Sequence, residues 1–193
     1  MALTPSTMMM PLGAEAPSFV LPDPSGKKHS LDDLVGTRGL VVMFICNHCP
    51  FVKHIQKELV TFAREVQGKG IGVVAINAND VGSHPEDSPE KMAVEQEEAG
   101  YSFPYLYDES QEIAKTYTAA CTPDFFLFDG SRKLVYRGRF DDSRPGNGVP
   151  VTGNDLRRAV EVCLAGGEPL EPQLPSMGCN IKWKPGSTPS YFG

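Results

Sequence analysis

The stretch LVVMFICNHCP, residues 40–50, joins a continuous apolar run to two cysteines that lie three positions apart. Leu40 to Ile45 is apolar and partly β-branched, which is typical of a strand buried on both faces. A proline such as Pro50 fits a helix only in its first turn, where the missing N–H has no partner to lose. Helical spacing follows, with apolar residues at Val52, Ile55, Leu59, Phe62, Ala63 and Val66. The sequence therefore predicts a buried strand, then Cys46 and Cys49 at the start of an amphipathic helix that ends near Gly68.

Further elements extend this unit in both directions along the chain. Residues 71–76 predict a second buried strand, parallel to the first through a right-handed crossover. A polar insertion over residues 79–103 carries Ser88-Pro89-Glu90, which indicates the start of a helix running to about Ala99. The remaining predicted elements are edge strands at 19–21 and 29–31, a short strand at 104–107, helices at 110–118 and 154–165, and a hairpin of 124–128 with 133–140.

The last 28 residues, 166–193, differ in composition from the rest. They are rich in Pro and Gly, which argues against a core element of their own. They nevertheless contain Cys179, Ile181 and Trp183, which are costly to leave in water. We expect an extended arm, without a strand of its own, that docks on the domain or on a neighbouring subunit. The expected division is a domain over residues 1–165 and an arm over residues 166–193.

Charge and length limit the possible partners. Eighteen Lys and Arg against 24 Asp and Glu give a net charge of −6, with no basic block for nucleic acid or an anionic membrane. The longest apolar run is far below the roughly 20 residues that span a bilayer, and no positive charge precedes Lys27. The expectation is a cytoplasmic monomer or homodimer with neither nucleic acid nor membrane as a partner.

Five cysteines, an odd number, stand at positions 46, 49, 121, 163 and 179. Cytosolic cysteines usually stay reduced unless they carry out redox chemistry or bind metal, so a structural disulfide framework is not expected. A helix N-terminus favours thiolate over thiol, and the spacing of Cys46 and Cys49 allows a disulfide to close between them. Such a dithiol can exchange with other disulfides through a mixed disulfide. Metal binding and inert packing are the alternatives for this pair.

The order of buried strand, C-x-x-C, helix and Thr122-Pro123 before a hairpin resembles the thioredoxin fold. The Gly-x-x-Ala-Pro-x-Phe opening at 13–19, the leading hairpin and the insertion resemble its redoxin branch. That branch contains alkyl hydroperoxide reductase-like proteins and membrane-anchored cytochrome-maturation thioredoxins. The resemblance spans about residues 13–165. It implies an α/β fold, a three-layer α/β/α sandwich with an N-terminal hairpin extension, a central insertion and an extended C-terminal arm.

The resemblance also implies roles for individual residues. Cys46 matches the exposed nucleophile and Cys49 the resolving thiol. His48 occupies the position of a histidine that stabilises the reduced thiolate. Pro123 matches a cis-proline that faces the dithiol, and Thr122 would offer its backbone to an extended substrate.

Two departures from these patterns are visible in the sequence. Leu40 stands where thioredoxin has a buried aspartate. In the usual peroxidatic motif a Thr or Ser lies three residues before the reactive cysteine. That position is Met43 when Cys46 is taken as the reactive cysteine, and Cys46 when Cys49 is taken. The usual peroxidatic site is therefore absent.

The other thiols allow two interpretations each. Cys121 lies two residues before Pro123 and is either an additional redox thiol or a half-buried neighbour. Cys179 is either brought by the arm within disulfide reach of Cys121 or Cys46, or packs as a small apolar residue. Cys163 lies on the apolar face of the last helix, where a packing role is expected. The charged cluster Arg137, Arg139, Asp141, Asp142 and Arg144 is either paired internally or contacts substrate.

The leading hypothesis is a thiol–disulfide oxidoreductase. It would act on a disulfide-containing protein or small molecule together with a thiol reductant, without cofactor or metal. The first alternative is a thiol-dependent peroxidase in which Cys46 becomes a sulfenic acid that Cys49, Cys121 or Cys179 resolves. The second is a metal-binding protein of the same fold.

Overall fold

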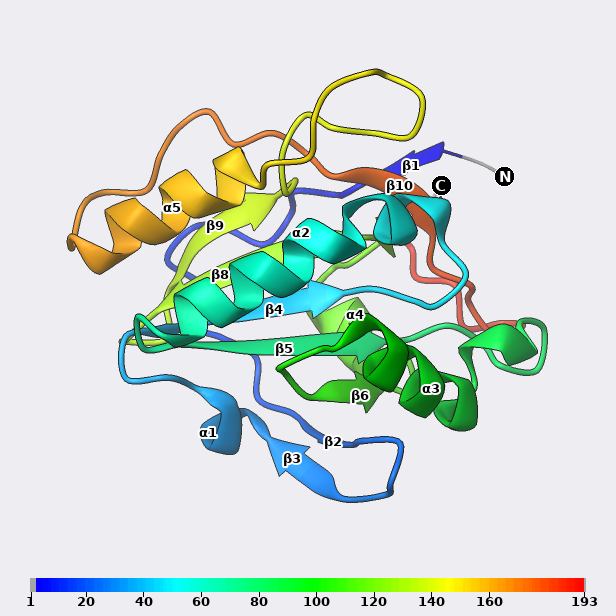
Figure 1. Cartoon of the computed structure of the whole chain (residues 1–193). Coiled ribbons are helices and arrows are strands. Elements are labelled where there is room, and N and C mark those ends of the chain that lie inside the picture. The colour runs from blue at the N-terminus through cyan, green and yellow to red at the C-terminus, as the bar shows by residue number, and fades with distance from the viewer. Residues whose placement is uncertain (1–2, 193) are drawn as a thin grey trace.

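The computed structural model describes residues 3–192, and β4 (Gly39–Phe44) lies in the middle of its central sheet (Figure 1). Antiparallel β8 (Asp124–Asp129) flanks β4 on one side, with Gly39 opposite Asp129 and Phe44 opposite Asp124. On the other side lies β5 (Ile71–Asn77), in the same direction as β4, because the amides of Arg38 and Ile45 donate to the carbonyls of Gly70 and Ile76. Parallel β6 (Tyr105–Tyr107) and antiparallel β9 (Leu134–Gly138) complete the order β6-β5-β4-β8-β9.

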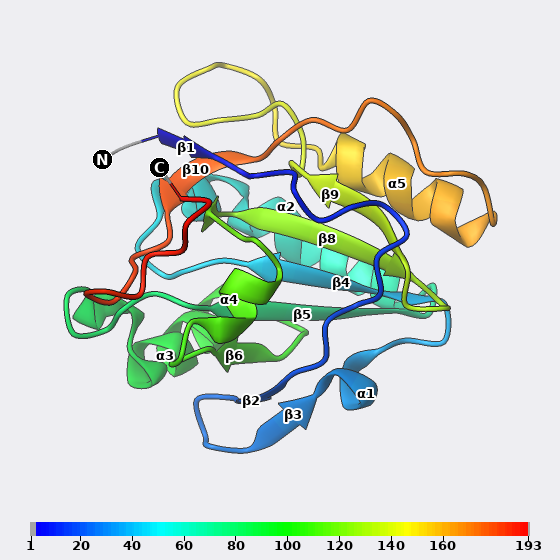
Figure 2. The same ribbon diagram turned by 180° about the vertical axis from the view of Figure 1, so that it is seen from behind.

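Two hydrophobic cores explain why β4 is apolar throughout. Val41 and Met43 face the core that contains α2 (Pro50–Gln67), together with residues of α3 (Pro89–Ala99) and α5 (Asn154–Leu164). Val42 and Phe44 face the opposite core, which contains residues of the N-terminal segment and of α4 (Glu112–Thr116). Figure 2 shows α4 and the N-terminal segment lying over the back of the sheet. The predicted three-layer α/β/α sandwich is therefore confirmed.

The N-terminal hairpin is confirmed with a small shift. Its strands are β2 (Val20–Pro22) and β3 (Lys28–Ser30), rather than 19–21 and 29–31. Ser30 ends the second strand because its side chain accepts from the Asp33 amide and forms a capping box that begins α1 (Leu31–Leu34). The predicted helix at 110–118 is shorter, and a single-turn 3-10 helix, η1 (Pro85–Asp87), precedes α3.

The C-terminal arm differs from the expectation because part of it forms a strand. Met177–Asn180 (β10) pairs antiparallel with β1 (Leu3–Pro5) on one edge and with β7 (Cys121–Thr122) on the other. Gly178 makes this pairing possible, because a Cβ there would lie 2.0 Å from the Thr122 carbonyl oxygen. The expectation of an arm without a strand is therefore wrong. Figure 1 shows β10 and β1 near the N-terminus of α2.

No helix within residues 3–192 is long and apolar enough to cross a membrane.

Candidate active site

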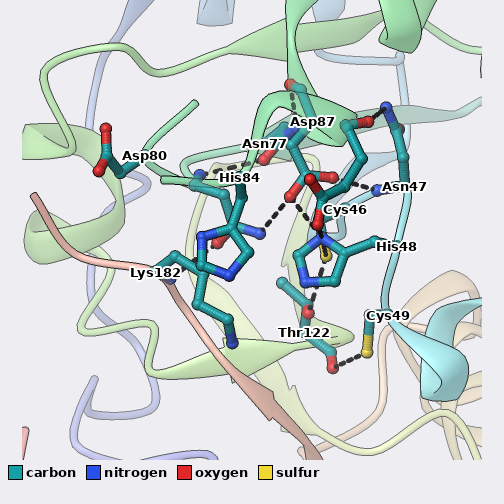
Figure 3. Close-up of polar contacts among 12 residues, drawn as sticks. Cys46, Asn47, His48, Cys49, Asn77, Asp80, His84, Asp87, Thr122 and Lys182 are labelled. Atoms are coloured by element: carbon teal, nitrogen blue, oxygen red, sulfur yellow. Dashed lines mark hydrogen bonds and ion pairs between the residues drawn. The ribbon is translucent and has the colours of Figure 1, made fainter. Parts of the chain in front are cut away.

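Cys46 and Cys49 follow β4 directly, and Cys49 is the residue that precedes the first turn of α2 (Figure 3). The predicted placement of the pair at a strand-to-helix junction is confirmed. Both side chains are buried, however, with 2% and 0% of their surface exposed. The expectation that Cys46 is exposed is wrong, because Thr122 lies against its sulfur and His48 lies nearby.

Thr122 contacts both sulfurs of the pair. Its hydroxyl oxygen lies 3.4 Å from the Cys46 sulfur, and its carbonyl oxygen lies 3.1 Å from the Cys49 sulfur, whose thiol form donates to it. The Thr122–Pro123 peptide bond is cis, as predicted. The strand edge on which an extended substrate was expected to pair is filled, because Thr122 lies opposite Cys179 of β10.

Cys179 lies beside Cys49, because its partner in the ladder is Thr122, whose carbonyl oxygen lies 3.1 Å from the Cys49 sulfur. The sequence predicts that Cys179 lies within disulfide reach of another cysteine, with Cys121 and Cys46 as the first choices, so Cys49 corrects the choice of neighbour. The register explains it: Asn180, not Cys179, is the partner of Cys121. The Cys121 sulfur lies instead 3.7 Å from the carbonyl oxygen of Pro123, and its side chain is fully buried.

Asp87 is the main site residue that the sequence did not single out. It ends η1, has 0% of its surface exposed, and accepts a hydrogen bond from the backbone amide of Asn47 at 2.8 Å. Its carboxylate also lies 2.6 Å from His48 Nδ1 and 2.7 Å from the Asn79 side-chain nitrogen. The same His48 nitrogen lies 4.0 Å from the Cys46 sulfur. The polar insertion thus supplies a carboxylate to the dithiol site (Figure 3).

This pairing shifts the pKa of both partners in the directions expected for an ion pair. The hydrogen bond to Asp87 raises the pKa of His48 above its usual value, against a smaller opposing effect of burial. Burial acts to raise the pKa of Asp87, but the hydrogen bonds from His48 and Asn79 outweigh it and lower that pKa. His48 therefore carries positive charge at a higher pH than an ordinary histidine does.

The pKa values of the two dithiol sulfurs are shifted in opposite directions. The hydrogen bond with Cys49 is the main cause that raises the pKa of Cys46, helped by burial and by the charge of Asp87. For Cys49 the hydrogen bond from Cys46 lowers the pKa, and further contributions come from Cys179 and the Val52 amide. Together with a contribution from Thr122, these hydrogen bonds outweigh burial, which acts to raise the pKa of Cys49.

Two clusters within the described residues contain potential metal ligands. One consists of Cys46, His48 and Asp87, and the other of His48, His84 and Glu86. His48 Nδ1 is already used by Asp87, and the His48 and His84 rings stack at 5.1 Å with an angle of 19°. Stacked rings direct their in-plane lone pairs side by side rather than toward one ion.

The charged cluster after β9 is paired internally. Arg139 lies 2.6 Å from both Asp142 and Asp155, and Asp141 accepts from the backbone amides of Ser143 and Gly153. A groove beside Pro123 runs between this loop and the arm, and it is lined in part by Phe51, Phe140 and Met177. Arg139, Asp141, Asp142 and Arg144 also line this groove, so the structure is consistent with both interpretations of the cluster.

Comparisons with known proteins agree with this geometry. The AhpC/TSA family matches residues 12–137. The chain is 34% identical over 129 residues to the thiol-disulfide oxidoreductase ResA of Bacillus thuringiensis (strain Al Hakam), covering 65% of this chain and 68% of that protein.

Two solved structures are also similar. An uncharacterized conserved protein from Geobacillus kaustophilus is 55% identical with a TM-score of 0.93, covering 96% of this chain and 98% of that one. A hypothetical protein from Sinorhizobium meliloti 1021 is 51% identical with a TM-score of 0.91, covering 94% and 98%. The resemblance to redoxins is confirmed.

Proposed function

The chain belongs to the AhpC/TSA family, and on that premise we propose that it is a thiol–disulfide oxidoreductase whose redox-active pair is Cys46 and Cys49. One observation carries this proposal: the two cysteines at the start of α2 both contact Thr122 of the Thr122–Pro123 loop, with sulfur–oxygen distances of 3.4 Å for Cys46 and 3.1 Å for Cys49. Similarity to ResA proteins, which are named as thiol-disulfide oxidoreductases, supports the same reaction class.

The reaction would proceed in two exchanges. The Cys46 sulfur attacks one sulfur of the substrate disulfide after its proton passes to Cys49, and the other substrate sulfur leaves as a thiolate that takes up a proton. Cys49 then attacks the Cys46 sulfur, which closes a Cys46–Cys49 disulfide and releases the second substrate thiol. A thiol reductant reopens this disulfide, so no cofactor is needed.

His48 and Asp87 would set the energetics of the pair. His48 lies 4.0 Å from the Cys46 sulfur, and its protonated form favours a thiolate there. Asp87 holds the ring in place and keeps it protonated to higher pH. Thioredoxin has a buried aspartate at the position that Leu40 occupies here. In this chain a buried carboxylate comes instead from Asp87, at a different position in the fold.

A peroxidase is the second candidate, because the same family contains alkyl hydroperoxide reductase-like proteins. The Thr122 hydroxyl beside the Cys46 sulfur is the observation that favours it. The absence of the usual peroxidatic motif opposes it, because Met43 stands at the Thr or Ser position for Cys46.

Parallel assays separate these reactions. One measures reduction of insulin disulfides with dithiothreitol, and the other measures hydrogen peroxide consumption with the same reductant. We expect disulfide reduction that is lost in Cys46→Ser and Cys49→Ser and retained in the control Cys163→Ser. Peroxide turnover that depends on Cys46, without insulin reduction, would contradict the proposal and support the peroxidase.

A further inference from the structure

The arm places its own strand where an extended substrate would pair. In this fold an incoming peptide adds to the edge formed by the residue before the cis-proline. Here that residue is Thr122, and its partner across the ladder is Cys179 of β10. Gly178 allows the two backbones to approach closely, because any Cβ there would collide with the Thr122 carbonyl. The chain therefore presents a cysteine of its own at the substrate edge.

The arm is fixed in this position on both sides of Cys179. Before it, the Ser6 amide donates to the Ser176 carbonyl at 2.9 Å. After it, the Ile181 amide donates to Ala120, and the Lys182 amide donates to the Asn79 side chain at 2.8 Å. These bonds hold the Cys179 side chain at one place beside the dithiol, as intramolecular reactants must be held.

Cys49 lies between two thiols as a result. Thr122 relates both to it: the Thr122 hydroxyl lies 3.4 Å from the Cys46 sulfur, and Cys179 pairs with Thr122 across the ladder. Cys121 is turned toward the Pro123 carbonyl, and Cys163 lies on α5. Within residues 3–192, Cys179 is the cysteine outside the motif that pairs with Thr122, the residue that contacts both sulfurs of the dithiol.

We propose that Cys179 is a third redox thiol that exchanges with the Cys46–Cys49 disulfide, an inference that rests on the proposed function. The Cys179 sulfur attacks the Cys49 sulfur and gives up its proton. The Cys49–Cys179 bond forms as the Cys46–Cys49 bond breaks, and Cys46 leaves as a thiolate that takes up a proton. The number of disulfides is unchanged, so no further oxidant is consumed. The product has a free Cys46 thiol and a disulfide that joins Cys49, at the start of α2, to Cys179 of the arm.

Peptide mapping of the full-length protein tests this step. The purified protein is oxidised with diamide, quenched in acid, alkylated and digested without reductant. The wild type should give both Cys46–Cys49 and Cys49–Cys179 peptides. Cys46→Ser should give Cys49–Cys179 alone, and the Cys46→Ser/Cys179→Ser double variant should lose it. The matched control Cys46→Ser/Cys121→Ser should keep it.

The outcomes separate this inference from the proposed function. A Cys46–Cys49 peptide in the wild type, without Cys49–Cys179 in either the wild type or Cys46→Ser, overturns the third-thiol role and leaves the oxidoreductase intact. Absence of the Cys46–Cys49 peptide from the oxidised wild type counts against the oxidoreductase itself. If Cys46→Ser does not fold, as judged by circular dichroism, the wild-type map decides: recovery of Cys49–Cys179 supports the inference and its absence overturns it.

Discussion

Asp87 and His48 come from two segments 39 residues apart, yet the Asp87 carboxylate lies 2.6 Å from His48 Nδ1 in the site beside Cys46. The carboxylate is fully buried, and 16% of the histidine side chain is exposed. The pair connects the polar insertion to the dithiol. The charge of Asp87 raises the pKa of Cys46, and the hydrogen bond to Asp87 raises the pKa of His48.

Asp87→Asn should lower the pKa of His48 toward about 6.5, because the main cause of its elevation is removed. It should also lower the pKa of Cys46, which the Asp87 charge raises. Loss of charge-assisted hydrogen bonds should cost about 1.5–3 kcal/mol of folding stability. NMR titration of the His48 ring and denaturant unfolding measure both effects. Glu86→Gln is the control, and equal His48 shifts in the two variants would contradict the role of Asp87.

The same pair predicts how stability depends on pH. The pKa of His48 is raised, so its contribution is complete below about pH 6.5 and is lost as pH rises through the folded-state value. The pKa of Asp87 is lowered, so its contribution is present above about pH 3.9 and is lost as pH falls through the folded-state value. The stability difference between wild type and Asp87→Asn should therefore be largest between about pH 4 and pH 6.5. A difference that grows above that range would contradict this account.

The reduced thiolate should belong to Cys49 and depend on Cys46. Cys46→Ala removes the donor that contributes most to the lowered pKa of Cys49, so that pKa should rise. Cys49→Ser should remove the acidic thiolate altogether. The ultraviolet absorbance of the thiolate, followed against pH, measures both changes. An acidic thiolate that survives in Cys49→Ser and disappears in Cys46→Ala would assign the charge to Cys46 instead.

Gly178→Ala should displace β10 from β7, because the added Cβ would lie 2.0 Å from the Thr122 carbonyl oxygen. Overpacking of this kind costs about 1–3 kcal/mol, and alkylation of Cys49 and Cys179 should become faster. Gly68→Ala is a matched control, because its Cβ would have no contact shorter than 3.4 Å. Thermal unfolding and timed alkylation compare the two. Unchanged alkylation in Gly178→Ala would show that β10 does not cover the dithiol.

His48→Pro should make the Cys46–Cys49 pair more reducing. The substitution removes a positive charge 4.0 Å from the Cys46 sulfur and leaves the Asp87 carboxylate without that partner, so the reduced form loses support. We expect a shift of about 30 mV, which corresponds to about 1.4 kcal/mol for a two-electron couple. His84→Ala is the control, since that ring stacks on His48. A potential that stays constant or rises in His48→Pro would contradict the assigned role.

Local patterns in the sequence were sufficient for most of the central fold. An all-apolar run predicts a strand with two buried faces, and β4 has both. The Ser88-Pro89 start of α3 and the helical spacing after Pro50 are also patterns among neighbouring residues. The structure confirms both helices. The dithiol was found because its spacing is a local feature, and the cis Thr122–Pro123 bond was predicted from the resemblance to the thioredoxin fold.

Contacts between distant segments could not be predicted in the same way. The strand β10 depends on a partner edge at Cys121–Thr122 and on Gly178, and neither its composition nor its periodicity signals a strand. In the sequence Asp87 is an ordinary acidic residue before a helix. Its place beside the Cys46–Cys49 motif depends on how the insertion folds back over that motif. The burial of Cys46 and the pairing of Cys179 with Cys49 follow from these tertiary contacts, and the sequence expectations failed at both.

The most direct test of the account is a redox titration of the wild-type protein in glutathione and dithiothreitol buffers, with each sample mapped for disulfides. We predict one two-electron transition within the range of about −270 to −120 mV that thiol–disulfide oxidoreductases span, accompanied by a Cys46–Cys49 disulfide. Cys46→Ser and Cys49→Ser should each lose that linkage, and Cys163→Ser should keep it. A wild-type pair that stays reduced throughout this range, or that forms only linkages between two molecules, would contradict the central claim.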